Sequence, residues 1–295
     1  MQKIVPHLWF DSEAKEAAEF YVSVLGGEVK SVTLYPNAGQ EIHGRQAGSV
    51  MTVDFTVRGF EMLALNGGPV FNFTPAISIT VECESAEEVD RLWGSLIDGG
   101  TALMDLDTYP FSPRYGWLRD RYGLTWQLIY HANAESHRMF PSLMFTGDVA
   151  GRAEEAMGFY TKTFPRSEIG MIARYGAGAE PDVEGSVTHG IFVLEDQTFS
   201  AMDSAHPHQF NFNEALSFLV RCEDQAEIDR LWSALSAHPE AEQCGWLKDR
   251  YGVSWQIVPA NLGEILGDDD TAVVDRRMAM LLSMKKIDIE TLRAA

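Results

Sequence analysis

Seven polar or aromatic side chains stand in otherwise apolar stretches of the chain, and these could contact a ligand. Ser, Gln, Asp and His supply hydrogen-bond donors and acceptors, and Trp supplies a flat apolar wall. A few such groups on a concave apolar surface suit a small organic molecule. The candidate binding residues are Trp9, Asp54, Ser78, Gln127, His189, Ser217 and Gln256.

No familiar catalytic signature accompanies them. GxSxG, HExxH and Walker-type loops are absent from the sequence. The glycine-rich stretch 176–185 lies between two predicted strands with no helix after it, so we expect a hairpin loop, matched by PNAGQEIHG in the first half. Cys83, Cys222 and Cys244 are odd in number and lack CxxC spacing, which favours neither a disulfide framework nor a zinc site.

The charge balance excludes several partners. Asp and Glu number 43 against 23 Lys and Arg, for a formal net charge of −20, which opposes binding to nucleic acid or anionic membranes. The chain opens on MQKIVPHLWF, without a basic segment followed by an apolar one, and has no uncharged apolar run long enough to span a bilayer. We therefore expect a cytoplasmic protein.

One segment occurs twice. GWLRDRYGLTWQLI (116–129) returns as GWLKDRYGVSWQIV (245–258), and EEVDRLWGSL (87–96) returns as AEIDRLWSAL (226–235). Since 295 residues exceed the usual size of one core, this order predicts a tandem duplication. We expect domains at 1–132 and 139–260 and a helical C-terminal tail at 261–295.

Within each repeat the hydrophobic pattern predicts β-α-β-β-β twice, so four such modules and an α+β fold. In the first module, Asp11 or Ser12 caps a helix that Gly26 and Gly27 end. In the second, Ser85 and Glu88 form a capping box. The predicted strands of the first repeat are 3–10, 28–35, 48–57, 60–65, 76–83, 102–106, 115–120 and 124–130.

This pattern resembles the vicinal oxygen chelate superfamily of glyoxalases, bleomycin resistance proteins and dioxygenases. Its modules end in D-x-x-G-x-x-apolar-E-apolar, which DRYGLTWQL and DRYGVSWQI match except that Gln127 and Gln256 replace the glutamate. LWFD, ALNGGPVFNF and EEVDRLW are similar to the PhnB-like branch, often labelled demethylubiquinone 3-methyltransferase, over both repeats and the KKIDIETLRAA tail. The resemblance implies two tandem domains of paired βαβββ modules, whose curled mixed sheets form open cups.

The resemblance also implies where a divalent metal would sit, on two His or Gln and two Glu. Counting along the strands puts the first ligand at Pro6, with His7 one residue off on the other strand face, and at Pro141 beside Ser142. The other positions fall at Met62 or Ala64, Phe199 or Ala201, Ser78, Ser217, Gln127 and Gln256. Because only the glutamines can bind a metal there, no cofactor is expected; the alternative is a loosely held divalent metal that His189 helps to bind.

Three functions remain open. The first is a protein that binds a small aromatic or amphipathic molecule in a cup, with Asp54, Ser78 and Gln127 in one and His189, Ser217 and Gln256 in the other. The second is a metal-dependent lyase or dioxygenase acting on vicinal oxygens, so whether the chain is an enzyme stays open. The third is a scaffold whose fused repeats replace the homodimer that single-repeat relatives form. Under any of these functions the protein is expected to be a monomer, with an internal pseudo-dimer, or a homodimer.

Two further expectations concern these readings. Trp126 and Trp255 either wall the cups or fill the core, and the halves have diverged to one working and one degenerate pocket. A methyltransferase of the common S-adenosylmethionine class is not expected, because it needs a doubly wound sheet with a glycine-rich turn.

Overall fold

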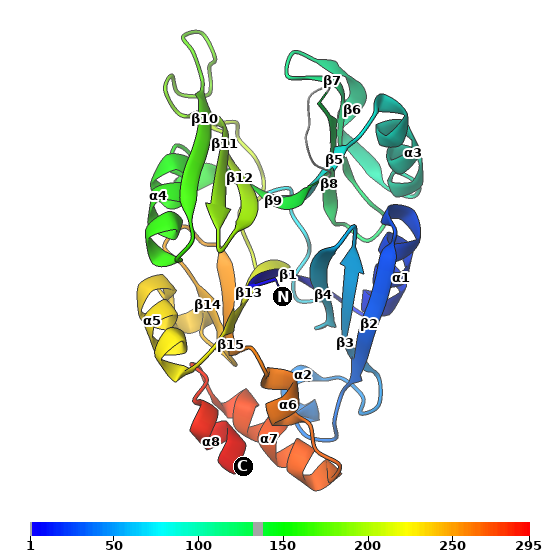
Figure 1. Ribbon diagram of the computed structural model, residues 1–295, viewed down its shortest axis with the longest axis vertical. Helices are drawn as coiled ribbons and strands as arrows, with labels where there is room; N and C mark the ends of the chain where they lie inside the picture. The colour runs from blue at the N-terminus through cyan, green and yellow to red at the C-terminus, as the bar shows by residue number, and fades with distance from the viewer. Residues whose placement is uncertain (1, 132–137) are drawn as a thin grey trace. The chain divides into compact units, whose positions relative to one another are not determined.

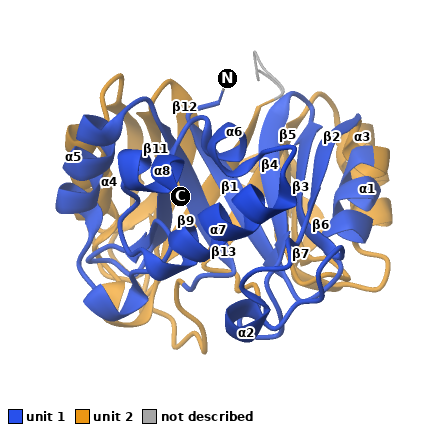
Figure 2. Ribbon diagram, turned by 90° about the horizontal axis from the view of Figure 1, so that it is seen from below, with its two compact units in different colours: residues 1–22, 27–72, 213–295 blue, residues 23–26, 73–212 orange. Residues whose placement is uncertain are grey.

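The computed structural model describes residues 2–131 and 138–295, which divide into two compact units. Figure 1 shows the chain coloured by residue number. Unit 1 comprises residues 1–22, 27–72 and 213–295, and unit 2 comprises residues 23–26 and 73–212 (Figure 2). Unit 1 thus combines the first module of the first repeat with the second module of the second repeat. Unit 2 combines the other two modules. The units do not coincide with the sequence repeats, and the boundaries at 132, 139 and 260 stay a prediction.

Unit 1 is built on a seven-stranded mixed sheet in the order β14-β15-β13-β1-β4-β3-β2. β1 lies at its centre, antiparallel to β13 and parallel to β4. The strands are β1 (Ile4–Phe10), β2 (Gly27–Leu34), β3 (Val50–Val57), β4 (Phe60–Asn66), β13 (Leu216–Cys222), β14 (Trp246–Lys248) and β15 (Ser254–Pro259).

Unit 2 has an eight-stranded mixed sheet in the order β10-β11-β12-β9-β5-β8-β7-β6. Here β9 is central, antiparallel to β5 and parallel to β12. The strands are β5 (Ile77–Cys83), β6 (Thr101–Tyr109), β7 (Ser112–Arg119), β8 (Thr125–Tyr130), β9 (Met139–Phe145), β10 (Glu168–Arg174), β11 (Val187–Leu194) and β12 (Gln197–Asp203).

Helices cover one face of each sheet, and the core lies between them. They are α1 (Ala14–Leu25), α3 (Ala86–Leu96), α4 (Ala153–Thr163) and α5 (Gln225–Leu235). In unit 1 the Tyr21 ring stacks on Phe55 at 6.3 Å between centroids, and in unit 2 Tyr160 stacks on Phe192 at 6.5 Å. Strand residues that alternate with these face away from the helices and form the concave face of each sheet.

The predicted module order is confirmed for three modules, and the fourth differs. Between α5 and β14, only residues 236–245 are available, and they hold the short 3₁₀ helix Pro239–Ala241. The corresponding link between α3 and Trp117 is about twice as long and contains β6. The fourth module is therefore β-α-β-β, because its shorter link leaves no room for the extra strand. Another difference is α2 (Gln40–His43), a short helix in the segment expected to be only a hairpin loop.

Helix α1 is capped from a distant strand rather than by Asp11 or Ser12. The Asn66 Oδ1 at the end of β4 accepts a hydrogen bond from the Ala14 N–H at 2.8 Å. In unit 2 the buried Asp203 does the same for Ala153 at 3.0 Å, and burial raises its pKa although backbone N–H groups hydrogen-bond to it. Asn66 and Asp203, which differ between the repeats, therefore both serve as helix caps. The Ser85 cap of α3 is confirmed, since Ser85 Oγ accepts from the Glu88 N–H.

The tail forms three helices in unit 1, α6 (Leu262–Leu266), α7 (Thr271–Ser283) and α8 (Ile289–Ala294). In the second turn of α7, toward its N-terminal end, Asp275 accepts hydrogen bonds from the backbone of Asn37 and Ala38. Past its other end, the carbonyls of Met284 and Lys285 accept from Cys244 and Gly245. The tail thus links the first-repeat and second-repeat parts of unit 1. Of the described helices, none is long and apolar enough to cross a membrane.

Candidate functional site

A row of four side chains crosses the concave face of unit 1. Cα partners in neighbouring strands share a sheet face, and the registers pair Asp54 with Leu63, Leu63 with His7, and His7 with Ser217. The residues next to them in sequence, such as Val53 and Phe218, are buried against the helices. This row forms the floor of the unit 1 cup.

The same row occurs in unit 2 with different chemistry. There the registers pair Ile191 with Ser200, Ser200 with Ser142, and Ser142 with Ser78. The floor of this cup is a run of hydroxyl groups: Ser142 Oγ lies 2.6 Å from Ser200 Oγ and 2.5 Å from Thr80 Oγ1.

The expected grouping of the candidate residues by repeat is wrong. Each sheet takes strands from both repeats, so the candidates are exchanged between the cups. Unit 1 holds Trp9, Asp54, Ser217 and Gln256, and unit 2 holds Ser78, Gln127 and His189. The sequence alone could not show this, because the exchange depends on which modules pair.

The two glutamines make equivalent bonds to neighbouring strands. Gln256 Nε2 donates to Ser217 Oγ at 2.9 Å, and Gln127 Nε2 donates to Ser78 Oγ at 2.9 Å. The Gln127 Oε1 also accepts from the Tyr115 hydroxyl at 3.0 Å. The amides are thus held in fixed orientations on the concave faces.

His7 is a floor residue that the strand count missed by one position. Its side chain is 3% exposed, and its Nδ1 has no hydrogen-bond partner among the described residues. Burial lowers the pKa of His7 from 6.5 to about 3, so the ring is neutral. The Trp246 indole lies edge-on to it at 5.5 Å between centroids. Residues 4–10, IVPHLWF, are nearly all apolar and do not alternate with polar residues, so the sequence could not decide which face of the strand His7 occupies.

The same correction applies to the other expected ligand positions. Ser217 is opposite His7 rather than Pro6, and Ser142 stands where Pro141 was expected. Leu63 and Ser200 take the floor positions assigned to Met62 or Ala64 and to Phe199 or Ala201, all four of which are buried on the helix-facing side.

Neither floor fits a divalent metal. One neutral imidazole, a leucine, a serine and a glutamine in unit 1, and three serines and a glutamine in unit 2, provide no carboxylate pair for a hard or borderline cation. Asp54 does not repair the first set, because it lies two strands from His7, about 10 Å away. Residues 2–131 and 138–295 contain no group of three His, Cys, Asp or Glu side chains placed to hold an ion.

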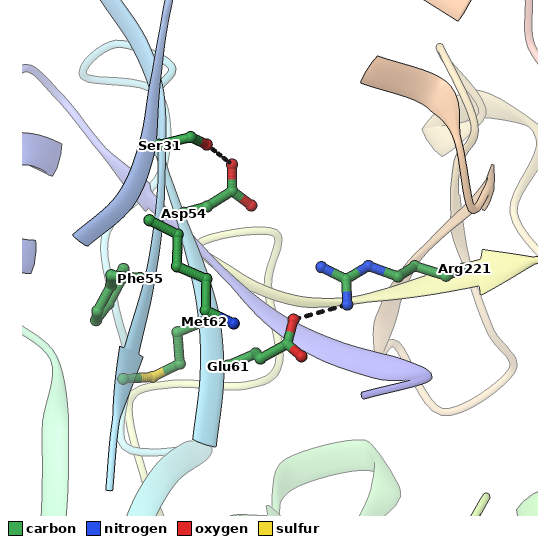
Figure 3. A pocket seen from close by; sticks show the side chains of 7 residues that line it. Ser31, Asp54, Phe55, Glu61, Met62 and Arg221 are labelled. Atoms are coloured by element: carbon green, nitrogen blue, oxygen red, sulfur yellow. Dashed lines mark hydrogen bonds and ion pairs between the residues drawn. The ribbon is translucent and has the colours of Figure 1, made fainter. Parts of the chain in front are cut away.

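Beside Asp54, unit 1 contains an open cavity of about 440 Å³ (Figure 3). Asp54 Oδ2 accepts a hydrogen bond from the Ser31 hydroxyl at 2.8 Å, whereas its Oδ1 accepts none from the described residues. On another side the Arg221 guanidinium bonds Glu61 at 2.8 Å, and the two side chains point toward one another. The lining residues are Lys30, Ser31, Asp54, Phe55, Glu61, Met62 and Arg221.

The charges at this cavity are mutually balanced. Partial burial would raise the pKa of Glu61, but hydrogen bonds from Arg221 and Gln2 and the charge of Lys30 outweigh it and hold the pKa below its ordinary value. Glu61 is therefore ionised at neutral pH. The cavity presents two carboxylates and two cations to anything that enters it.

Trp9 lies on the concave face of unit 1. Its indole packs against Phe71 at 5.1 Å and Trp246 at 6.0 Å between centroids, and its Nε1 donates to the Gly68 carbonyl at 2.8 Å. A Cβ on Gly67 would lie 2.2 Å from the Trp9 ring, so glycine is required there.

His189 lies at the mouth of a smaller cavity in unit 2, of about 30 Å³. Its ring is exposed, yet desolvation by the surrounding protein, and then the charge of His131, lower its pKa. The lining residues are Pro75, Trp117, Gln127, Ser142, Leu143, Met144, His189, Ser200, Ala201 and Met202.

Trp126 and Trp255 do not wall the cups. Both indoles are almost fully buried on the helix-facing side, and their Nε1 atoms donate to Asp120 and Asp249 at 2.8 and 2.9 Å. The repeated DRYGxxWQ segment therefore mainly stabilises the fold, while its glutamine lies on the concave face.

A family model described as 3-demethylubiquinone-9 3-methyltransferase matches the chain twice, at residues 2–129 and 137–258. The chain belongs to this family. Within this methyltransferase-named family, a PhnB protein from Bacillus cereus is similar at 38% identity, over 44% of this chain and 100% of that one, with a TM-score of 0.40.

Other solved structures are similar over one repeat or over both. A Pseudomonas aeruginosa protein shares 25% identity over 44% of this chain and 98% of that one, with a TM-score of 0.37. Glyoxalase I from Zea mays matches 88% of this chain and 94% of its own at 9% identity, with a TM-score of 0.51. The likeness to glyoxalase I concerns the fold, and it confirms the vicinal oxygen chelate fold. No curated protein matches the chain.

Proposed function

We propose that the protein binds a small polar organic molecule on the concave face of unit 1, without a resident metal. The observation that carries this proposal is the cavity of about 440 Å³ beside Asp54. Its size lies within the range of pockets that hold small ligands, about 300 to 1,000 Å³. The cavity is suited to a polar rather than an apolar molecule, because Phe55 and Met62 line it with their backbone while their side chains pack toward the helices. Its charged lining residues are Lys30, Asp54, Glu61 and Arg221.

The free groups of the cavity define the ligand's chemistry. Asp54 Oδ1 has no donor among the described residues, so it is available to an N–H or O–H group of a ligand. Arg221 and Lys30 can donate hydrogen bonds to a carbonyl or carboxylate oxygen on another side. The ligand therefore carries a hydrogen-bond donor and an acceptor. Trp9, Ser217 and Gln256 line the adjoining floor of the same cup.

The metal-dependent alternative is not proposed, because the floor residues do not fit a divalent ion. A methyltransferase activity is not carried over from the family's description either. The described sheets are mixed, and β10 is joined to β11 by a hairpin rather than by a helix, whereas the common S-adenosylmethionine class uses a doubly wound sheet. We propose a monomer, since each sheet already combines both repeats, and a cytoplasmic location.

The test is a thermal-shift screen of small polar metabolite-like compounds, followed by titration calorimetry of each hit. A ligand held at Asp54 should raise the melting temperature of the wild type further as its concentration rises above Kd, with the logarithmic dependence expected of linked binding. Asp54→Asn should weaken its binding at least tenfold, by about 1.4 kcal/mol or more, as expected for a hydrogen bond to a charged acceptor. Asp105→Asn, which changes an exposed carboxylate of unit 2, is the matched control. Hits that bind Asp54→Asn as tightly as the wild type would refute this site.

A further inference from the structure

An ion pair beside the unit 1 cup is missing its acid in unit 2. In unit 1, Lys248 Nζ lies 2.8 Å from the Glu214 carboxylate. The repeat places Arg119 where Lys248 stands and Pro75 where Glu214 stands. In the described part of the chain, the Arg119 guanidinium forms no ion pair, and its Nε is shielded from solvent without a hydrogen-bond partner.

Arg119 shares the concave face of unit 2 with Trp117. Along β7, Trp117 pairs with Gln127 and Arg119 pairs with Thr125, whereas the intervening Leu118 is fully buried on the helix-facing side. Trp117 Nε1 is likewise shielded and unpartnered among the described residues. Trp117 and Pro75 both line the cavity of about 30 Å³. Two donors without acceptors therefore lie on one face.

The hydroxyl groups of the floor add surplus donors. Ser200 donates to Ser142, and one hydrogen serves the contact between Ser142 and Thr80, so one hydroxyl hydrogen of that pair is left over. Ser78 accepts from Gln127, and its own hydrogen has no acceptor among the described residues. The floor of unit 2 thus has hydroxyl hydrogens available to a ligand, and the residues lining its cavity include no carboxylate, unlike the unit 1 cavity with its two carboxylates.

We propose that the concave face of unit 2 is a second binding site, specific for the oxyanion group of a small organic carboxylate or phosphate. Arg119 supplies the charge, and the Trp117 N–H and the floor hydroxyls supply the remaining hydrogen bonds. Planar guanidinium groups suit such two-oxygen groups. A cavity of about 30 Å³ has room for about one or two water-sized groups, such as oxygens of the oxyanion, and the rest of the ligand lies outward beside His189.

Two physical arguments favour an anion at this place. A shielded donor without an acceptor is destabilising, and an oxyanion that accepts from it would remove that cost. The net charge of −20 repels anions at long range, so only a local cation without a neighbouring acid can hold one. The second face is then not degenerate but selects a different ligand from the face proposed above.

The test uses two probes, benzoate and inorganic phosphate, titrated separately by calorimetry at physiological ionic strength. The variants are Arg119→Gln, which removes the charge, and Pro75→Glu, which restores the acid found in unit 1. Lys248→Gln is the matched control in unit 1. We expect saturable binding of one probe by the wild type and by Lys248→Gln, and a loss of at least tenfold in both unit 2 variants.

The pattern of outcomes decides the proposal. Binding of benzoate alone identifies a carboxylate site, and binding of phosphate alone identifies a phosphate site. No saturable binding of either probe, or equal affinity in Arg119→Gln with an unchanged melting temperature, would overturn it. Because Asp54 is untouched in these variants, failure here leaves the unit 1 proposal standing.

Discussion

The carboxylate of Asp249 accepts a hydrogen bond from the indole of Trp255 at 2.9 Å. Its other oxygen accepts from the backbone N–H groups of Tyr251 and Val253, at 2.8 and 3.1 Å. One side chain thus closes the turn before β15 and fixes the largest side chain of the neighbouring core. Asp120 does the same for Trp126, which explains why this segment is so similar in both repeats.

Replacing Asp249 with Ala should therefore destabilise the protein strongly. The change leaves three buried donors without an acceptor, and the expected loss is about 3 kcal/mol, less than the sum of three separate bonds because they share one carboxylate. Asp249→Asn keeps one acceptor oxygen and should lose about half as much. Urea unfolding measures both against the exposed Asp105→Ala. An unchanged unfolding midpoint in Asp249→Ala would contradict the role of this carboxylate.

Most of the fold could be predicted from the sequence, because each module carries strong local signals. Alternating strands, the Ser85 cap and the paired glycines after α1 specify most of their elements within a residue or two, whereas β6 and β7 each extend three residues beyond one predicted end. The cap of α1 could not be predicted, since Asn66 lies 52 positions away from Ala14. The fourth module lacks a strand because the link between α5 and β14 is short. The length of this link can be read from the sequence, but the similarity of the repeats favoured predicting the same strands in both.

The candidate site was predictable only in part. The residue types were found, yet their grouping depends on how β1 pairs with β13 and β9 with β5, which are long-range contacts. His7 was placed on the wrong face, because a shift of one residue reverses every side chain of a strand. Arg119 was missed because it is unusual only in comparison with the other repeat, where Glu214 pairs with Lys248, whereas Pro75 stands in place of that acid in its own repeat.

His7 should make stability depend on pH. Its pKa is lowered from 6.5 to about 3 by burial, so between these values the unfolded state binds a proton that the folded state does not. Its contribution is complete above about pH 6.5 and is lost as the pH falls toward 3, at up to about 1.4 kcal/mol per pH unit. Unfolding free energies measured from pH 7.5 to 4 should therefore fall less steeply in His7→Leu than in the wild type.

The control for this experiment is His238→Leu, which changes an exposed histidine of the same unit. Because His238 contacts Glu240, Val183→Ala, an exposed change that removes no titratable group, is added as a second control, and its slope should match that of the wild type. Equal slopes in His7→Leu and the wild type would show that the His7 ring is not held neutral in the folded state.

Chelation should leave the protein intact. Since neither cup floor offers a donor set for a divalent ion, EDTA treatment should change the melting temperature by less than about 1 °C, and added Zn²⁺ or Mn²⁺ should not raise it. Differential scanning calorimetry of untagged protein measures this, with elemental analysis on the same sample. A stoichiometric metal whose removal lowers the melting temperature would contradict the metal-free site.

The C-terminal tail should stabilise unit 1 selectively. Leu292 and Ile287 are fully buried, and the segment before them binds the backbone at Cys244 and Gly245 that leads into β14. Leu292→Ala should cost about 2 to 4 kcal/mol, the usual range for a leucine truncated in a core. The loss should appear in unit 1, because both ends of the tail are bound there.

Hydrogen exchange followed by mass spectrometry can locate that loss. Amides of β14 and β15 should exchange faster in Leu292→Ala, while those of β11 and β12 in unit 2 keep their protection. Val183→Ala, an exposed change in unit 2, should leave both regions as in the wild type. Equal loss of protection in both units would mean that the chain unfolds as one cooperative body, and the tail would then stabilise the whole protein rather than the Trp246 side of one cup.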